Sequence, residues 1–162
     1  NKLSDTTLIF SAHGLPENKI KRGDPYQWQV ENTVEHLVKK LSIKNLNYIL
    51  SYQSRVGPLK WIGPSTETII KEEAKKQKII IVVPVAFVSE HSETLVELDI
   101  EYKKLAVQSG SKDYIRIPAV TANQDFINSL KSSILSASNG ELFTSSIKCL
   151  QKFKKCPRLQ NI

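Results

Sequence analysis

KIIIVVPV, residues 78–85, is the stretch that decides the fold. Five consecutive Ile and Val residues, 79–83, stand at its centre, and β-branched side chains favour extended backbone. The run shows no alternation with polar residues, which is typical of a central parallel strand that is covered on both faces. It therefore predicts a buried strand inside a layered α/β domain.

Working outward from this strand, apolar runs alternate with helical patterns. Further strands are expected at residues 6–11, 48–52 and 114–117, and helices at about 25–41, 65–77, 90–106 and 123–135. Asp24 is expected to cap the first helix, with Pro25 at its first position, where a missing N–H costs nothing. Strands that alternate with helices predict an α/β, Rossmann-like fold: a four-stranded parallel sheet with helices on both faces.

Composition sets the broad class of the chain. Its 162 residues, 40% hydrophobic and 24% charged, suit one soluble α/β domain. No apolar run reaches the roughly 18 to 20 residues of a membrane span, and two cysteines make no disulfide framework, so a reducing compartment is expected. The chain has no methionine and begins with Asn, which indicates a fragment of a longer protein.

The net charge of +7 raises the question of nucleic acid or an anionic membrane as partner. The lysines are spread along the chain and lack the interleaved aromatic residues of a single-strand binding groove. A solvated basic surface is the preferred interpretation, and no nucleic-acid partner is expected. The cluster between Lys148 and Arg158 is the best candidate for an interaction segment.

Two histidines follow predicted strands that we expect to be neighbours. In open α/β sheets, ligands bind outside the carboxyl ends of the strands, where the strand order reverses. With an assumed order 2-1-3-4, His13 after the first strand would lie beside His91 and Glu93 after the third. His13 by itself proves little, because a lone histidine in a loop is more often structural.

The predicted helix at 90–106 is unusually acidic. Residues 90–101 hold five acidic side chains and no basic one, and Glu93, Glu97 and Glu101 line one face over about 12 Å. Like charges at this spacing destabilise a helix by a few tenths of a kcal/mol per pair. A solvated acidic face and a cation-attracting site both remain open. Carboxylate and imidazole together suit a divalent first-row metal, while no zinc signature and no phosphate loop occurs.

Two aromatic residues also follow strand ends. Trp61 and Phe87 are most simply packing residues, yet a flat macrocycle would need apolar, aromatic walls of this kind. The residues alone leave both interpretations open.

Three segments resemble signature motifs of the ferrochelatase family. LIFSAHGLP (8–16), followed by RGDPY (22–26), looks like the family's S-A-H-x-L-P and R-G-D-P-Y pair. SYQSRVGPLKWIGPST (51–66) resembles its Q-S-x-V-G-P-x-x-W-L-G-P loop, and PVAFVSEHSETLVELDIEY (84–102) its P-x-A-F-x-S-D-H-x-E-T-L-x-E-L-D-I-E-Y segment. One departure is Glu90, where the family often has Asp. The family fold is two similar Rossmann-like halves around a porphyrin cleft, and these motifs belong to the second half.

The resemblance implies a chelatase-type domain organisation and an activity. Residues 1–138 would form the second α/β domain and 139–162 a basic tail, with the N-terminal half of the enzyme absent from this chain. The implied activity is that of a lyase, which inserts Fe²⁺ into protoporphyrin IX to form protoheme, the last step of haem biosynthesis. A cobalt or nickel chelatase of the same fold, and a non-catalytic haem- or metal-binding module, are the alternatives.

The resemblance also implies roles for individual residues. His13 would be the active-site histidine, as metal ligand or acceptor of a pyrrole proton, and Glu93 its catalytic partner across the cleft. Glu97 and Glu101 would extend the metal-binding set along a helix with a widened π-type turn. His91 would support Glu93, and porphyrin contacts would come from Trp61, Phe87, Tyr26 and Ser54.

Cofactor and location follow from the same resemblance. The reaction needs no soluble cofactor, because Fe²⁺ is a substrate. Some members hold a [2Fe–2S] cluster on three C-terminal cysteines and one from the first half; only Cys149 and Cys156 are present here, so no cluster is expected. The expected partners are protoporphyrin IX, Fe²⁺ and the N-terminal half, in a bacterial cytoplasm, with peripheral attachment to the inner membrane as an alternative.

Overall fold

A four-stranded parallel sheet with the order β2-β1-β3-β4 forms the centre of the protein. The computed structural model describes residues 3–140 and 153 of the chain. The four predicted strands and the assumed order are both confirmed. The strands are β1 Thr6–His13, β2 Tyr48–Gln53, β3 Ile79–Pro84 and β4 Asp113–Arg116.

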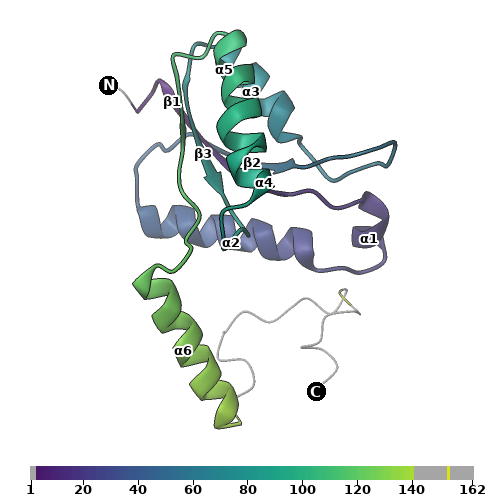
Figure 1. Ribbon diagram of the computed structural model, residues 1–162, viewed down its shortest axis with the longest axis vertical. Helices are drawn as coiled ribbons and strands as arrows, with labels where there is room; N and C mark the ends of the chain where they lie inside the picture. The colour runs from purple at the N-terminus through teal and green to yellow at the C-terminus, as the bar shows by residue number, and fades with distance from the viewer. Residues whose placement is uncertain (1–2, 141–152, 154–162) are drawn as a thin grey trace.

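Helices cover both faces of the sheet, as predicted (Figure 1). On one face, α2 (Tyr26–Leu41) buries Val30 and Val34 against Phe10 and Tyr52. On the other, α3 (Thr66–Lys75) and α5 (Lys103–Gln108) pack on Ile80 and Val82 of β3. The β-branched strand is therefore buried between two apolar layers, and burial of that surface is the main favourable term in folding.

The predicted acidic helix is three segments rather than one. α4 (Ser92–Leu95) is followed by η1 (Glu97–Tyr102), a π-helix, which runs directly into α5. The π-type turn implied by the family resemblance is thus confirmed. The predicted start at Glu90 is wrong, because His91 is extended and its side chain caps α4 by accepting the N–H of Glu93.

Other boundaries also differ from the predictions. His13 is the last residue of β1 and not a loop residue, and a short helix, α1 (Glu17–Lys21), follows it. α2 begins at Tyr26 with Pro25 before it, while Asp24 accepts the N–H of Tyr26 at 2.9 Å. α3 begins at Thr66, within a residue of the predicted start, and the Ser65 side chain caps it by accepting the N–H of Thr68.

The last helix, α6 (Gln124–Ser138), begins after an Asn123 cap and buries none of its residues. It projects away from the sheet (Figure 1). Most of the predicted basic tail, including Cys149, Cys156 and the cluster from Lys148 to Arg158, lies outside the described residues. Phe153 is described, and its ring lies 5.5 Å from that of Trp28 on α2. None of the described helices has the length and apolar content needed to cross a bilayer.

Arg116, at the end of β4, ties the acidic segments to the sheet. Its guanidinium donates to both carboxylate oxygens of Asp99, at 2.8 and 2.5 Å, and to Glu90 at 2.5 Å. Glu90 also accepts the backbone N–H of Ala119 at 2.9 Å. Two of the five acidic residues between 90 and 101 are therefore structural and share one arginine as their partner, which sequence periodicity did not indicate.

We expect this ion-pair cluster to make stability depend on pH. Burial opposes the charge on Glu90, but hydrogen bonds from Thr94, Arg116 and the Ala119 backbone outweigh it and hold the pKa of Glu90 at about 2. Because this pKa is below the ordinary value of 4.5, the stabilisation is complete above pH 4.5 and is lost as the pH falls from there towards 2.

The test is chemical denaturation of an Arg116→Met variant at several pH values. The Arg116 side chain is only 10% exposed, so leaving its partners unpaired should cost about 3 kcal/mol near pH 7. The loss should shrink towards pH 2. A matched control is Lys71→Met, whose pair with Glu67 is 46% and 54% exposed and should contribute less than about 1 kcal/mol. Equal losses in the two variants would contradict the structural role of Arg116.

Candidate functional site

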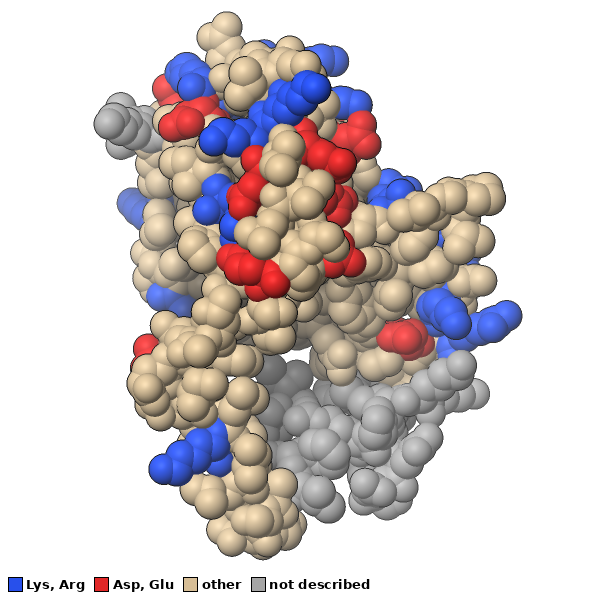
Figure 2. Space-filling model, in the orientation of Figure 1, with Lys and Arg blue, Asp and Glu red and all other residues tan. Residues whose placement is uncertain are grey.

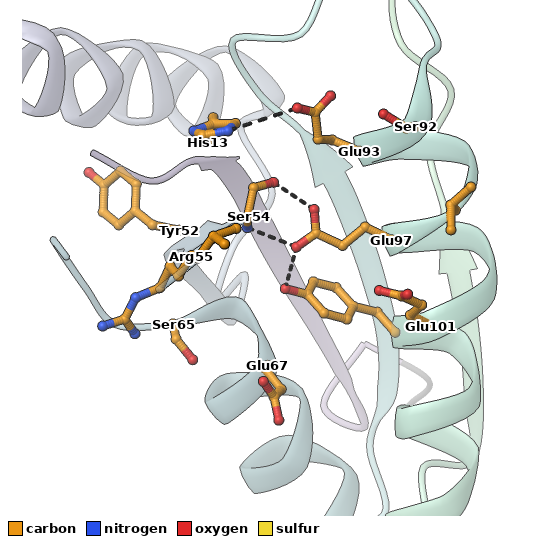
Figure 3. Close-up of a pocket in the computed structure, with 13 residues that line it drawn as sticks. His13, Tyr52, Ser54, Arg55, Ser65, Glu67, Ser92, Glu93, Glu97 and Glu101 are labelled. Carbon is orange, nitrogen blue, oxygen red and sulfur yellow. Dashed lines mark hydrogen bonds and ion pairs between the residues drawn. The ribbon is translucent and has the colours of Figure 1, made fainter. Parts of the chain in front are cut away.

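A pocket of about 610 Å³ opens at the carboxyl ends of β1 and β2. Its lining combines strand-end residues with one side of the α4–η1 column (Figure 3). The polar residues that line it include His13, Ser54, Glu93, Glu97, Glu101 and Tyr102. From β1 the chain continues to β2 on one side and to β3 on the other, and in open α/β sheets ligands bind at such a change of direction. The pocket lies at this point.

His13 presents one free ring nitrogen at the mouth of the pocket. Its Nδ1 is 2.7 Å from the carbonyl oxygen of Gly14, and because a carbonyl only accepts, Nδ1 carries the proton. In the neutral ring Nε2 is then an acceptor, and it lies 3.9 Å from Oε1 of Glu93. The His13 and Glu93 side chains are 41% and 38% exposed, so a ligand can reach both. This geometry suits a base or a metal donor at Nε2.

His91 contacts both the backbone and the side chain of Glu93. The Nδ1 atom of His91 accepts the Glu93 N–H at 3.2 Å and also contacts Oε2 of the Glu93 carboxylate. The ring of Phe87 lies 5.2 Å from the His91 ring and tilts against it. His91 therefore contacts both the backbone and the carboxylate of Glu93, and the supporting role that the resemblance implies for it stays a prediction.

Glu97 is held by four neutral donors. Oε1 accepts from the Ser54 N–H and the Tyr102 hydroxyl, both at 2.8 Å, and Oε2 accepts from the Gln53 amide at 2.9 Å and the Ser54 hydroxyl at 2.6 Å. Burial, followed by the neighbouring Glu97 charge, raises the pKa of Tyr102, so its hydroxyl stays protonated as a donor. The charge of this carboxylate is therefore stabilised by dipoles and needs no counter-ion.

Ser54 reaches Glu97 through an unusual backbone conformation. Its φ of 58° lies in the left-handed region, which residues with a Cβ adopt rarely and at a cost of order 1 kcal/mol. This turn directs both the N–H and the hydroxyl of Ser54 at the same carboxylate (Figure 3). The two hydrogen bonds offset the conformational cost.

The three glutamates of the acidic row share one face of the column, as the spacing predicts, and that face lines the pocket. Glu93, Glu97 and Glu101 all line it, from α4 into the π-helix η1 (Figure 3). In the space-filling view, acidic side chains gather over this column (Figure 2). Within residues 3–140 and 153, however, no three His, Cys, Asp or Glu side chains converge as a set that could hold a metal ion.

Of the four residues predicted to contact porphyrin, only Ser54 lines this pocket in the described part of the chain. Tyr26 donates its hydroxyl to the carbonyl of His13 at 2.9 Å, and Phe87 packs on His91. Trp61 lies against Gly14, where an added Cβ would be 3.2 Å from the indole and 3.0 Å from a backbone oxygen. These three rings support the site residues, and their contact with a macrocycle stays a prediction.

Sequence reasoning missed Gln53 and Tyr102. Gln53 is buried at the end of β2 and bonds to both Glu97 and the backbone carbonyl of Glu93. Tyr102 ends the π-helix and donates to Glu97. Both residues lie in the motifs that carry the family resemblance, so a polar residue at a strand end and a tyrosine after an acidic row were the available signals.

Comparison with known proteins bears on this site. The sequence model named Ferrochelatase matches residues 1–138. The ferrochelatase of Pelagibacter ubique (strain HTCC1062) is 58% identical over 161 residues, covering 97% of this chain and 47% of that protein. Those of Rickettsia felis and Rickettsia bellii (strain OSU 85-389) are 51% and 49% identical, covering 92% and 94% of this chain and 45% of each relative.

The matches cover nearly all of this chain but only part of each relative. The chain spans about half the length of the curated relatives that it matches. The matched residues include His13, the acidic row and all four strands, so the likeness covers the sheet and the pocket together. By the family match over most of its length and by relatives of this identity, the chain belongs to the ferrochelatase family.

Proposed function

We propose that the protein to which this chain belongs inserts Fe²⁺ into protoporphyrin IX, and that this chain supplies one wall of the site and its proton acceptors. The observation that carries the proposal is Nε2 of His13, which accepts no described hydrogen bond and lies 3.9 Å from Glu93 in a pocket lined by three further carboxylates, those of Glu67, Glu97 and Glu101. Metal insertion requires a base beside the macrocycle centre and an environment that attracts a dication, and this pocket offers both.

The reaction exchanges one Fe²⁺ for two pyrrole protons without a change of oxidation state. Nε2 of His13 would accept a pyrrole proton, and Glu93 would balance the positive charge that develops on the ring. The Glu93 carboxylate, 3.9 Å from Nε2 of His13, would accept the second pyrrole proton. Each proton that leaves is replaced by one positive charge of the metal, so the site remains balanced.

The other two carboxylates would act on the incoming metal. Glu101 lies two positions along the row from Glu93, with Glu97 between them, and all three face one pocket. Neutral donors hold the Glu97 carboxylate, and no lysine or arginine of the described residues pairs with it, although Arg55 also lines the pocket beside four glutamates. A ferrous ion would therefore be attracted along the row towards His13.

The reaction also bears on the enzyme class, the missing half and the cellular location. The enzyme would be a lyase without a soluble cofactor, and its second wall would come from the N-terminal half that the relatives' length leaves outside this chain. We place it in the bacterial cytoplasm, with attachment to the surface of the inner membrane as an alternative. A [2Fe–2S] cluster is not part of the proposal; of the cysteines that such a cluster would use, this chain contains Cys149 and Cys156.

A fusion protein tests the proposed activity. The N-terminal half of the Pelagibacter ubique relative, joined to this chain, should convert protoporphyrin IX to protoheme with Fe²⁺ under anaerobic conditions, followed by loss of porphyrin fluorescence. The 162-residue chain alone should show negligible turnover, because a cleft needs two walls. Robust turnover by the chain alone would contradict that. A fusion that binds porphyrin but never metallates it would instead be a carrier, and a preference for Co²⁺ or Ni²⁺ and another tetrapyrrole would indicate a different chelatase.

His13→Ala in the fusion should abolish turnover, since no other group presents a free ring nitrogen to Glu93 in the described part of the chain. Porphyrin binding should stay largely intact, because apolar walls supply most of the affinity. The matched control is His36→Ala on the exposed surface of α2, which should leave the rate unchanged. Near-normal turnover of His13→Ala would move the base elsewhere, with His91 as the first candidate.

Substitutions in the acidic row should separate rate from metal affinity. Glu93→Gln should cut kcat sharply, whereas Glu101→Gln should mainly raise KM for Fe²⁺, and both should change stability by less than about 0.5 kcal/mol. Glu97→Gln should also lower the melting temperature, because its new NH₂ group would face donors. Glu35→Gln on α2 is the control. Unchanged kinetics in all three variants would indicate that the acidic row is a solvated face without a role in catalysis.

A further inference from the structure

One buried amide joins the end of β2 to the acidic helix. Gln53 is 1% exposed, and its Nε2 donates to the carbonyl oxygen of Glu93 at 2.8 Å and to Oε2 of Glu97 at 2.9 Å. A single side chain thus holds a backbone group of α4 and a carboxylate of η1 at once. Gln53 does not itself line the described pocket, so it can act on a ligand only through these two residues.

The orientation of this amide is fixed by a chain of buried hydroxyls. Ser11 donates to Oε1 of Gln53 at 2.7 Å, and Thr66 lies 2.9 Å from both the Ser11 and Ser51 hydroxyls. Each hydroxyl has one hydrogen, and that of Ser11 is used on Gln53, so Thr66 donates to Ser11. Ser51 then donates to Thr66 at 2.9 Å in preference to the Phe10 carbonyl oxygen, which is 3.4 Å away. The result is a directed chain from Ser51 through Thr66, Ser11 and Gln53 to Glu97.

All four members before Glu97 are essentially inaccessible, at 0% or 1% exposure. In such surroundings hydrogen bonds strengthen one another, and an unpaired member is costly. Rotating the Gln53 amide would turn its oxygen towards the Glu93 carbonyl and the Glu97 carboxylate, both of which only accept here. The hydroxyl chain and the two acceptors therefore permit one orientation only.

The amide acts where the helix changes type. The carbonyl of Val96 accepts from both Ile100 and Glu101 at 3.0 Å, which marks the change from the α to the π pattern. π-turns are rare and need support from outside the helix. The Gln53 bonds to Glu93 and Glu97 lie on either side of Val96 and hold the column at this point.

We propose that Gln53 is a positioning residue of the site: with Ser51, Thr66 and Ser11 behind it, it holds the π-turn open and fixes Glu97 towards the pocket. The kinetic consequence rests on the proposed function, whereas the structural one does not. Without the amide, the column loses its tie to β2, and the carboxylates that face the pocket lose their fixed direction.

The first experiment replaces Gln53 by Met, which has a similar length but no hydrogen bonds, in the fusion protein. We expect kcat to fall at least tenfold with porphyrin affinity unchanged. In a Glu97→Gln background the same substitution should lower kcat by a smaller factor than in the parent fusion, because the part of its effect that passes through Glu97 is already lost. Independent, multiplying effects in this cycle would overturn the proposal.

A matched control separates positioning from general loss of a buried polar pair. Thr7 on β1 is 0% exposed and donates to Oε2 of Glu73 at 2.7 Å, away from the pocket. Thr7→Val should lower the melting temperature while kcat stays within twofold. If Gln53→Met does not fold, Thr66 gives a second pair: Thr66→Val removes the hydroxyl and should lower kcat, and Thr66→Ser should restore it. Equal rates for the two Thr66 variants would overturn the proposal.

Hydrogen exchange decides the structural part without any assay of activity. In the 162-residue chain, Gln53→Met should speed exchange at the amides of η1 more than at those of α3, and Thr7→Val should not. A fusion without chelatase activity would count against the proposed function, while the exchange result would still decide whether Gln53 holds the helix. Exchange at η1 equal to that of the parent chain would overturn the inference.

Discussion

β1 pairs in parallel with β2 on one side and β3 on the other, and every residue of the site depends on this arrangement. The register places His13 opposite Gln53 and Ser11 opposite Pro84, so both neighbouring strands end beside the histidine. Parallel strands present their carboxyl ends at one edge of the sheet, and the strands that follow β1 lie on opposite sides of it. His13, the Ser54 turn and the segment that carries Glu93 therefore meet, although they lie far apart in the sequence.

The carboxylates at this edge of the sheet are stabilised in different ways. Arg116 pairs with both Glu90 and Asp99 on one side of the acidic column, where the guanidinium also joins β4 to the helices. Glu97 is surrounded by four neutral donors, which stabilise its charge without cancelling it. Within residues 3–140 and 153, the side chains that pair with the Glu93 carboxylate are two histidines. The pocket is lined by four glutamates and one arginine, Arg55, so acidic side chains predominate there inside a chain of net charge +7. Such a pocket attracts cations, whereas lysines in the same places would repel them.

The supporting layer of the site is made of side chains that never face the pocket. Tyr26 holds the His13 carbonyl, Trp61 packs on Gly14, and Phe87 tilts against His91. Gln53 and its hydroxyl chain do the same for the acidic column. This division explains why several aromatic and polar residues of the family motifs are buried: their contacts fix the direction of the few exposed groups that can meet a ligand.

The sequence by itself determined the layers of this protein. The β-branched run at 78–85, the alternation of strands with helices and the Ser65 cap follow from local periodicity and propensity, which a short window of sequence contains. The acidic row at positions 93, 97 and 101 was visible in the same way, and its π-type turn came from the family motif. Only the tertiary structure decided which acidic residues are structural and which face the pocket. Arg116 meets Asp99 across 17 positions and Gln53 meets Glu97 across 44, and such pairings depend on how strands and helices are brought together. The start of the acidic helix was mispredicted for a related reason, since it is set by the side chain of His91, which accepts the N–H of Glu93 and leaves Glu90 free to pair with Arg116.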